Sequence, residues 1–405
     1  MQTNLSNQAL SLPRAKEAED ILRTCVHCGF CNATCPTYQL LGNELDGPRG
    51  RIYLIKQMLE GEPVSDKTQL HLDRCLTCRN CETTCPSGVK YHSLLDIGRD
   101  MLDRSVERPL AQRVMRSGLR KVIPRPRMFG AMLKAGRLLR GALPSTIADK
   151  IPHNVISEGT RPPVRHTRRM LMLEGCAQRA LSPNTNAATA RVLDRLGVSI
   201  EAVSEAGCCG AVDYHLDAQN AGLDRARRNI DAWWPKIAAG AEGIIQTASG
   251  CGAFVKEYGH LLRDDPAYAE KARRVSELAC DIGEALARLP IESLSVKPDK
   301  RVAFHCPCTL QHAQKLGGSI EGLLTRLGFT LTGVPDAHLC CGSAGTYAFT
   351  QPELSRQLRD NKLDALESGK PDVIATANIG CQTHLGGAGR TAVRHWIEIV
   401  DEAIA

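Results

Sequence analysis

Two short runs of cysteine carry the clearest chemistry in this 405-residue chain. Each run has four cysteines followed by proline, and the two sets are Cys25, Cys28, Cys31 and Cys35, then Cys75, Cys78, Cys81 and Cys85. Both follow the pattern C-x₂-C-x₂-C-x₃-C-P, which holds [4Fe–4S] clusters in bacterial two-cluster ferredoxins. Such clusters accept and release single electrons. The runs therefore predict electron transfer.

The spacing also predicts which cysteines act together. Three thiolates of one tight loop reach three corners of a cubane, and the fourth cysteine of the run ligates the other cluster. The first predicted set is Cys25, Cys28, Cys31 and Cys85. The second is Cys75, Cys78, Cys81 and Cys35. Zinc sites are disfavoured because they seldom use a third cysteine at the same step, and disulfides because the chain starts with no secretory signal.

A second group of cysteines recurs in the C-terminal half. Cys208-Cys209-Gly210 returns as Cys340-Cys341-Gly342, and Cys251 returns as Cys381, at offsets of 130 to 132 positions, which indicates an internal duplication. The first copy offers the thiols of Cys176, Cys208, Cys209 and Cys251. The second offers Cys306, Cys308, Cys340, Cys341 and Cys381, with His305 beside them. We expect at least one copy to bind a metal or a further iron–sulfur cluster; buried, reduced cysteines left by duplication are the alternative.

Strands and helices alternate around these cysteines. Each copy has three apolar strand candidates, at 170–173, 198–203 and 243–247, then at 302–304, 330–334 and 372–376. Helices are expected at 218–233 and 352–366. This alternation predicts a parallel sheet in each copy, with the cysteines at the carboxyl ends of the strands, where open α/β sheets bind ligands. Cys280 matches nothing in the other copy and is interpreted as a small buried residue.

The N-terminal part is predicted to be helical. Asp46-Gly47-Pro48 is typical of a helix start and Gly61 of its end, and a second helix is expected over 67–74. Arg49, Arg51, Arg74 and Arg79 lie near the cysteine runs in sequence. They either offset the cluster charge or lie on the surface, and the sequence does not decide between the two.

A basic, proline-rich connector joins the two halves. From Arg104 to Arg169 it holds sixteen Lys or Arg against three acids, in a chain whose formal charge is +7. Apolar residues alternate with cations over 127–140, which is typical of an amphipathic helix. Such a helix suits a membrane surface or a partner's groove, or else it packs its apolar stripe on the protein itself.

The expected fold class is therefore α+β and multi-domain. A helical two-cluster ferredoxin-like domain covers 1–103, the connector 104–168, and two duplicated α/β Cys-Cys-Gly modules 169–290 and 299–405. No run of about 18 apolar residues predicts a membrane-spanning helix. No G-x-G-x-x-G follows a strand, so we expect no flavin in this chain. The chain also lacks a recognised nucleic-acid-binding module, so we expect no nucleic-acid partner.

Longer strings resemble the iron–sulfur subunits of bacterial glycolate oxidase (glycolate dehydrogenase). They span 25–31, 46–51, 173–176, 205–210 and 304–308, and the likeness runs almost end to end. The resemblance implies FAD-binding partner chains that oxidise glycolate to glyoxylate, with this chain passing electrons toward a quinone or another acceptor. It also implies a place on the cytoplasmic side, peripheral to the inner membrane. In that family the eight cysteines of the two runs are the cluster ligands.

Equivalent subunits of lactate or anaerobic glycerol-3-phosphate dehydrogenases would use the same electron wiring. A more distant likeness is to heterodisulfide reductase, whose Cys-Cys-Gly modules end in C-x-x-C. Here Cys251 and Cys381 are not followed by that second cysteine, which puts a non-cubane cluster in doubt. His305 and His384 are candidate substitute ligands.

Overall fold

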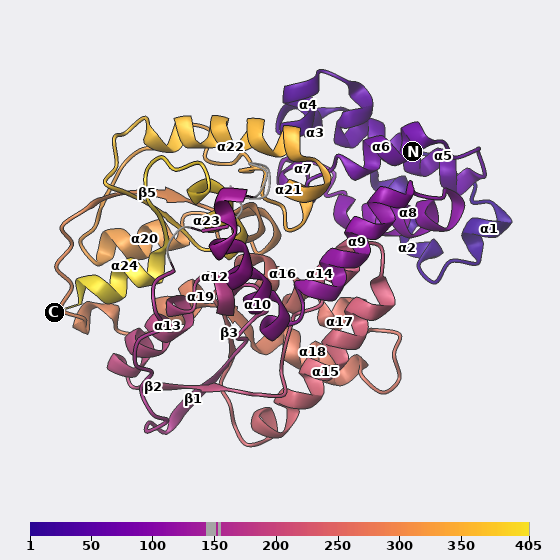
Figure 1. The fold of residues 1–405 in the computed structure, drawn as a ribbon. Helices are drawn as coiled ribbons and strands as arrows, with labels where there is room; N and C mark the ends of the chain where they lie inside the picture. The colour runs from indigo at the N-terminus through magenta and orange to yellow at the C-terminus, as the bar shows by residue number, and fades with distance from the viewer. Residues whose placement is uncertain (143–150, 153–154, 405) are drawn as a thin grey trace. The chain divides into compact units, whose positions relative to one another are not determined.

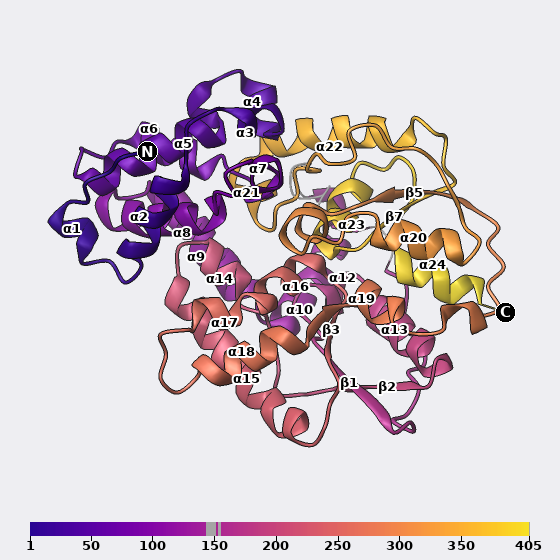
Figure 2. The ribbon, with the colours of Figure 1, turned by 180° about the vertical axis from the view of Figure 1, so that it is seen from behind.

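The structure is a computed structural model that describes residues 1–142, 151–152 and 155–404. The chain forms two compact units. The first comprises Met1–Arg116 and His338–Leu358, and the second comprises Ser117–Ala337 and Arg359–Ala405. Figure 1 labels their elements, and Figure 2 shows them from behind.

The first unit is helical, as the sequence predicted. Its helices are α1 (Asn7–Leu10), α2 (Ala15–Thr24), α3 (Phe30–Ala33), α4 (Pro36–Leu41), η1 (Glu44–Asp46), α5 (Pro48–Glu60), α6 (Asp66–Asp73), α7 (Asn80–Thr84), α8 (Tyr91–Ser105) and α21 (Tyr347–Thr350). The α5 helix starts at Pro48 and stops at Gly61, whose φ of 95° ends the helix at little cost for glycine. Gly98 of α8 lets that helix pack closely on Ile55 of α5, where a Cβ would lie 2.8 Å from the Ile55 side chain.

The two cysteine runs have matching backbones. Cys25 and Cys75 each follow a helix, and Cys35 and Cys85 each follow the short helix that contains the third cysteine of the run. Between the cysteines, His27 and Gly29 have positive φ in the first run, and Thr77 and Arg79 have positive φ in the second. These left-handed residues curl each loop, so that its thiols can face one volume.

The second unit contains two four-stranded parallel sheets with the same strand order. The first has the order β2-β1-β3-β4 and consists of β1 (Arg168–Met172), β2 (Val198–Ala202), β3 (Ile244–Gln246) and β4 (Ala279–Asp281). The second has the order β6-β5-β7-β8 and consists of β5 (Arg301–His305), β6 (Thr330–Leu331), β7 (Val373–Thr376) and β8 (Val393–His395). The predicted parallel sheets and duplication are confirmed. The sequence pattern did not indicate β4 or β8, because a three-residue strand shows no usable periodicity.

Helices surround these sheets, and two of them occupy the expected stretches: α15 (Gln219–Ala238) and α22 (Pro352–Glu367). The other helices of the first module are α12 (Gln178–Leu181), α13 (Asn184–Arg195), α14 (Ala211–His215), α16 (Ser249–Lys256), α17 (Tyr258–Leu261), α18 (Ala269–Leu278), α19 (Ile282–Ala287) and η3 (Ile291–Ser293). Those of the second are η4 (Thr309–Ala313), α20 (Ser319–Arg326), α23 (Ile379–Gly386) and α24 (Trp396–Ala403).

The two modules share one hydrophobic core. Val192 and Val198 of the first module pack in the same cluster as Phe304, Ile320 and Trp396 of the second. Backbone contacts also join the modules, because Ser249 N donates to Ala377 O at 3.0 Å and His395 Nε2 lies 2.8 Å from Thr247 O. The modules therefore form one compact body and are not two separate domains joined by a linker.

The connector contains α9 (Leu110–Val122), α10 (Pro126–Leu138) and η2 (Arg140–Ala142), while its residues 143–150 and 153–154 lie outside the described part. Within the described ranges, no helix is both long and apolar enough to cross a bilayer. The residue ranges of the four expected domains stay predictions.

Candidate metal centres

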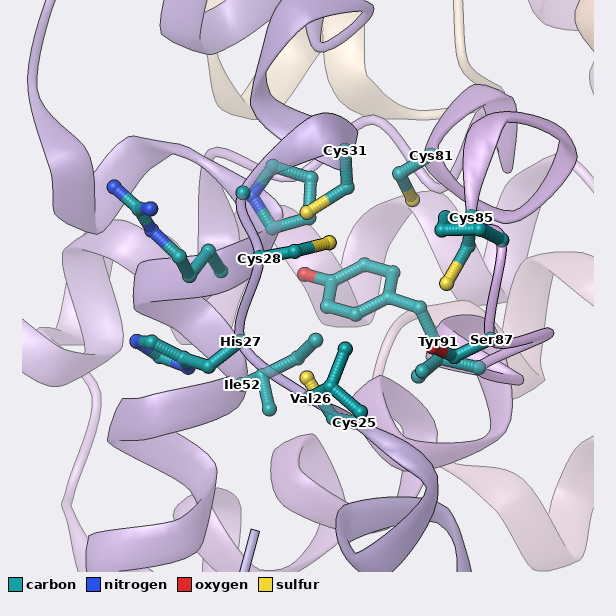
Figure 3. A pocket seen from close by; sticks show the side chains of 15 residues that line it. Cys25, Val26, His27, Cys28, Cys31, Ile52, Cys81, Cys85, Ser87 and Tyr91 are labelled. Carbon is teal, nitrogen blue, oxygen red and sulfur yellow. The ribbon is translucent and has the colours of Figure 1, made fainter.

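The first cysteine group gathers around one pocket of the first unit. Cys25, Cys28, Cys31 and Cys85 line this pocket, and Figure 3 shows their sulfurs directed toward a common space. Burial raises the pKa of Cys31 to about 11, and the neighbouring Cys25, Cys85 and Cys28 raise it further. The structure thus brings Cys85 of the second run to three cysteines of the first.

The second cysteine group is built in the same way. Burial raises the pKa of Cys81 well above its usual range, with added contributions from Cys78, Cys75 and Cys35. Cys35 of the first run therefore lies with three cysteines of the second. Each group offers four thiols, the donor set of a [4Fe–4S] cluster. Thiols must lose their protons to bind iron, so a bound cluster would replace the mutual repulsion of four neighbouring thiolates with attraction to the metal.

Tyr91 connects the two groups. This buried residue lines the first pocket, and its hydroxyl donates to Cys75 Sγ of the second group at 3.7 Å. Burial raises the pKa of Tyr91, so its hydroxyl keeps its proton as a donor. The sequence did not point to Tyr91, since nothing in it distinguishes this residue from the other six tyrosines.

The second group rests on a buried network of charges. Arg51 is 1% exposed, and its guanidinium donates to Thr37 Oγ1 at 3.1 Å and reaches Cys35 Sγ at 4.0 Å. Asp46 is fully buried and accepts from Arg74 Nη1 at 3.0 Å, while His71 Nδ1 lies 3.0 Å from its other oxygen. The network places a fixed positive charge beside Cys35, where it offsets thiolate charge.

The four arginines whose position the sequence left undecided therefore differ in burial and in their partners. Arg51 is interior, whereas Arg49 is part-exposed and forms an ion pair with Glu44 at 2.6 Å. Arg74 is also part-exposed and is held by Asp46. Arg79 precedes α7 as its N-cap residue and has a φ of 62°.

The four thiols of the first module lie together inside the second unit. Cys176 hydrogen-bonds to Cys208, Cys208 to Cys209, and Cys209 to Cys251. The thiols of Cys176 and Cys209 hold the pKa of Cys208 well below its usual range. Each cysteine follows the carboxyl end of a strand, as predicted. The arrangement is that of a metal-binding pocket rather than of scattered core cysteines.

Two polar side chains that the sequence analysis missed hold this corner. Asn229 is fully buried, accepts from Gly207 N at 2.8 Å and donates to Cys208 O at 3.0 Å. The Tyr258 hydroxyl donates to Cys209 O at 2.5 Å. Gly210 has a φ of 105°, and a Cβ there would lie 2.4 Å from Gly222 O, so only glycine fits.

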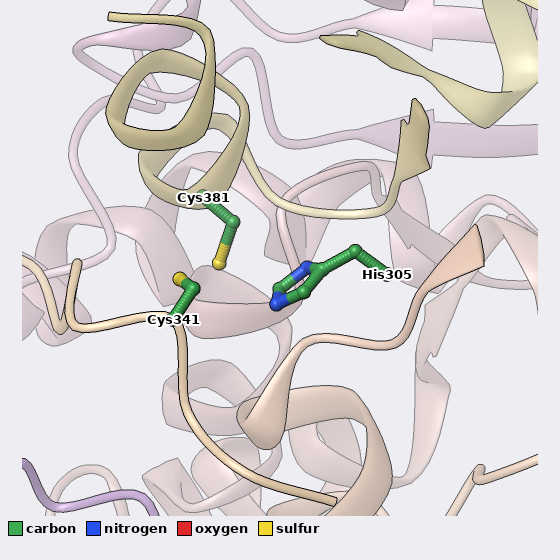
Figure 4. A group of neighbouring side chains, drawn as sticks. All are labelled: His305, Cys341 and Cys381. Carbon is green, nitrogen blue, oxygen red and sulfur yellow. The ribbon is translucent and has the colours of Figure 1, made fainter. Parts of the chain in front are cut away.

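The cysteines of the second module are divided between the units. Cys306, Cys308 and Cys381 belong to the second unit, and Cys340 and Cys341 to the first. Within the second unit, Figure 4 shows the Cys381 thiol and the His305 ring turned toward each other, and their ligand atoms lie within 4.8 Å. Cys280 is buried as predicted, and burial raises its pKa to about 12.

His305 has the geometry of a metal ligand. Its Nδ1 lies 3.0 Å from Thr376 Oγ1, and its Nε2 is buried without a hydrogen-bond partner among the described residues. Burial lowers its pKa to about 3, so the ring is neutral, with a proton on one nitrogen and a lone pair on the other. Of the two histidines suggested by the sequence, His305 is the one placed beside Cys381 in this way.

The second Cys-Cys-Gly corner packs with the ferredoxin-like helices of the first unit. Asn80 donates to His338 O at 3.2 Å, and the Tyr347 hydroxyl donates to Arg74 O at 3.1 Å. Burial raises the pKa of Tyr347, and Cys75 and Cys340 both contribute. The corner therefore lies close to the second cysteine group. No sequence motif marked Tyr347.

Comparisons with known proteins agree with this architecture. A family model described as "4Fe-4S dicluster domain" matches residues 21–89, and one described as "Cysteine-rich domain" matches 170–256 and 302–386. The glycolate oxidase iron-sulfur subunit of Escherichia coli K12 is 69% identical over 404 residues, covering 100% of this chain and 99% of that protein. The chain belongs to the family of glycolate oxidase iron–sulfur subunits. The expected resemblance, the fold class and the iron–sulfur cofactors are thereby confirmed.

Other members and neighbours lie further away. Within the glycolate oxidase iron–sulfur subunit family, a probable member from Bacillus subtilis 168 is 32% identical over 423 residues, covering 95% of this chain and 94% of that protein. Lactate utilization protein A of Bacillus licheniformis is 29% identical over 217 residues, covering 52% of this chain and 88% of that protein. A crystal structure of a hypothetical protein from Helicobacter pylori aligns with a TM-score of 0.56 at 10% identity, covering 98% of this chain and 74% of that one, and shows the fold alone.

Proposed function

We propose that this chain is the electron-transfer subunit of a multi-subunit glycolate dehydrogenase. FAD-containing partner chains oxidise glycolate to glyoxylate, and this chain passes their electrons toward a quinone or another acceptor. The observation that carries the proposal is end-to-end identity of 69% to a glycolate oxidase iron–sulfur subunit, together with two four-thiol groups. A flavin takes two electrons from a hydroxy acid, whereas cubane clusters carry one at a time.

The ligands are proposed to be Cys25, Cys28, Cys31 and Cys85 in one group, and Cys75, Cys78, Cys81 and Cys35 in the other. The protein's own contribution is to fix these thiols in loops that contain residues with positive φ, and to control the charge and hydrogen bonding around them. Arg51 provides a buried cation, and the Tyr91 hydroxyl donates to Cys75. Three of the eight proposed ligating thiols, Cys25, Cys35 and Cys81, are buried, which limits the access of water to that part of each centre.

We further propose a metal or an iron–sulfur cluster in the first cysteine-rich module. Four thiols in mutual contact, three of them buried, support this. For the second module, the predicted set Cys306, Cys308, Cys340, Cys341 and Cys381 stays a prediction, and so does His305, whose ligand atom lies within 4.8 Å of the Cys381 thiol.

We place the complex on the cytoplasmic side, peripheral to the inner membrane. The lactate-linked alternative draws support from the likeness to lactate utilization protein A, but that likeness covers about half of this chain at 29% identity. Anaerobic glycerol-3-phosphate oxidation and heterodisulfide-type chemistry are further alternatives, and an assay with each hydroxy substrate separates the oxidative ones.

The test is to purify the complex without oxygen and to assay glycolate, lactate and glycerol-3-phosphate with a soluble dye as acceptor. We expect glycolate to be the preferred substrate and its oxidation to depend on this chain. Preference for lactate, or glycolate turnover that is unchanged when this chain is left out, would overturn the proposal.

A further inference from the structure

Helix α10 presents an apolar face to solvent instead of burying it. Leu138 is 87% exposed, Leu139 60%, Met132 55% and Met128 37%, whereas Leu133 is the one buried residue of the helix. Met128, Met132, Ala135 and Leu139 recur at i, i+4, i+7 and i+11, so they follow one side of the helix. The apolar stripe that the sequence predicts is therefore not this protein's own core.

The inner side of α10 packs against other elements of the second unit. The helix contacts α12, and a Cβ on Gly130 would lie 3.9 Å from Ala180 Cβ (Figures 1 and 2). A Cβ on Gly136 would lie 2.8 Å from Ile151 Cδ1. The contact at Gly136 is too close for a Cβ, whereas the one at Gly130 is an ordinary van der Waals distance, and both show that the helix packs by this inner side. This packing fixes the direction in which the apolar residues point.

The surface around this face is strongly positive. Residues 109–142 contain nine Lys or Arg and no Asp or Glu, although acids make up 44 of the 405 residues of the chain. On α9, the three cations nearest to acids are neutralised, because Arg113 pairs with Glu107, Arg116 with Asp73 and Arg120 with Asp213.

Among the described residues, the cations of α10 have no such acidic partners. Arg127 and Lys134 lie seven residues apart at one edge of the exposed face, and both are exposed. Neither forms an ion pair with any acid in the described ranges. The apolar face is thus bordered by charge that calls for an anionic partner.

We propose that α10 is the site at which this chain binds an anionic lipid bilayer. The helix would lie in the interface, with its methionines and leucines at the acyl boundary and with Arg127 and Lys134 reaching lipid phosphates. A bilayer fits better than a protein groove because a continuous apolar face with cations along its edge matches a planar, negatively charged surface. The inference deepens the proposed peripheral location and is independent of which substrate the partner chains oxidise.

The experiment is vesicle co-sedimentation of the anaerobically purified full chain. The vesicles contain either phosphatidylcholine alone or phosphatidylcholine with phosphatidylglycerol. We expect binding to the anionic vesicles that weakens as salt is raised. Removing two cations with Arg127→Gln/Lys134→Gln should weaken binding by about thirty-fold, at about 1 kcal/mol for each cation. Met132→Ser/Leu138→Ser should weaken it at least tenfold.

Matched controls remove comparable groups elsewhere. Lys16→Gln/Lys67→Gln removes two exposed cations of the first unit, and Leu10→Ser removes a leucine that is 59% exposed. Both controls should bind like the parent chain. Equal iron content and equal unfolding midpoints confirm that every variant is folded.

Vesicle binding that is unchanged in both α10 variants, or that ignores anionic lipid, overturns the inference. So does an outcome in which the α10 variants bind vesicles normally but no longer associate with the flavin subunits, because α10 would then be a protein interface. Dye-linked glycolate oxidation should be retained in the α10 variants. Absence of that activity in the parent complex would count against the proposed function and not against the lipid site.

Discussion

The two Cys-Cys-Gly modules share a strand order but use their corners differently. In the first module, the corner Cys208-Cys209 lies inside its own unit, in hydrogen-bond contact with Cys176 and Cys251. In the second, the corner Cys340-Cys341 belongs to the unit of the ferredoxin-like helices, where Tyr347 bonds to Arg74. Duplication has therefore preserved the scaffold while one corner became a self-contained pocket and the other a neighbour of the second cysteine group.

The surroundings of the corners explain this difference. Asn229 and Tyr258 tie the backbone carbonyls of Cys208 and Cys209 to the first module's own helices. The carbonyl of Gly342 is held by Ser355 Oγ at 2.7 Å, from the part of α22 that belongs to the first unit. The two corners have the same Cys-Cys-Gly sequence but are hydrogen-bonded to different helices. Each corner therefore has different neighbours.

The largest effect is expected from breaking the cysteine group that adjoins the second corner. Cys81→Ala removes a proposed ligand, so the chain should lose about four irons and the electron-transfer rate should fall at least 100-fold. Iron analysis and dye-linked turnover measure this. Cys280→Ala, which removes a buried thiol outside the groups, is the control and should keep both values. Full iron content in the Cys81 variant would contradict the ligand assignment.

A second test unties only the first corner. Asn229→Ala leaves Gly207 N and Cys208 O buried without partners, which should lower the free energy of unfolding by about 2–4 kcal/mol. Denaturant unfolding measures the loss. The EPR signals of the ferredoxin-like clusters should be unchanged, because Asn229 lies in the other unit. A loss of those signals would show that the two corners are not separate in the way described.

The pH dependence of the free energy of unfolding tests a feature of the second module. His395 is fully buried, and burial lowers its pKa to about 4 from 6.5. Because the folded-state pKa is depressed, the stabilisation is complete above pH 6.5 and declines as the pH falls toward 4. Between pH 7.5 and 5 this residue should account for a loss of about 2 kcal/mol. Unfolding curves at the two pH values test this, with His395→Gln expected to flatten the dependence; an equal slope in the variant would contradict it.

The smallest effect is expected from loosening the second corner. Tyr347→Phe removes only the hydrogen bond to Arg74 O and should cost about 1 kcal/mol. Hydrogen exchange should then quicken in residues 338–358 and leave 205–210 unchanged. Ser204→Ala, which removes an exposed hydroxyl near the first corner, is the matched control. Equal protection of 338–358 in the parent chain and the Tyr347 variant would contradict the described packing.

The sequence was sufficient where the signal was local. The spacing of Cys25 to Cys35 predicted a curled loop, and Pro48 and Gly61 marked the ends of α5. Long-range partners were out of reach, because Asn229, Tyr258 and Tyr347 act through residues 21 to 273 positions away. The strand β4 was missed for another reason: three residues are too few to reveal a period.

The connector shows a third kind of limit. The pattern of Met128, Met132 and Leu138 predicted an amphipathic helix, but it fitted equally a helix facing solvent and one facing the core. Which side of the helix faces solvent depends on where Gly130 and Gly136 pack, and this packing is seen only in the folded chain.

The most direct test of the account is iron and acid-labile sulfide analysis of the anaerobically purified chain, with EPR of the dithionite-reduced sample. Two cubane clusters predict about eight irons and eight sulfides in the ferredoxin-like domain, with interacting signals that Cys81→Ala reduces to those of one cluster. A chain that contains no iron or labile sulfide and still carries electrons from glycolate to the dye would contradict it.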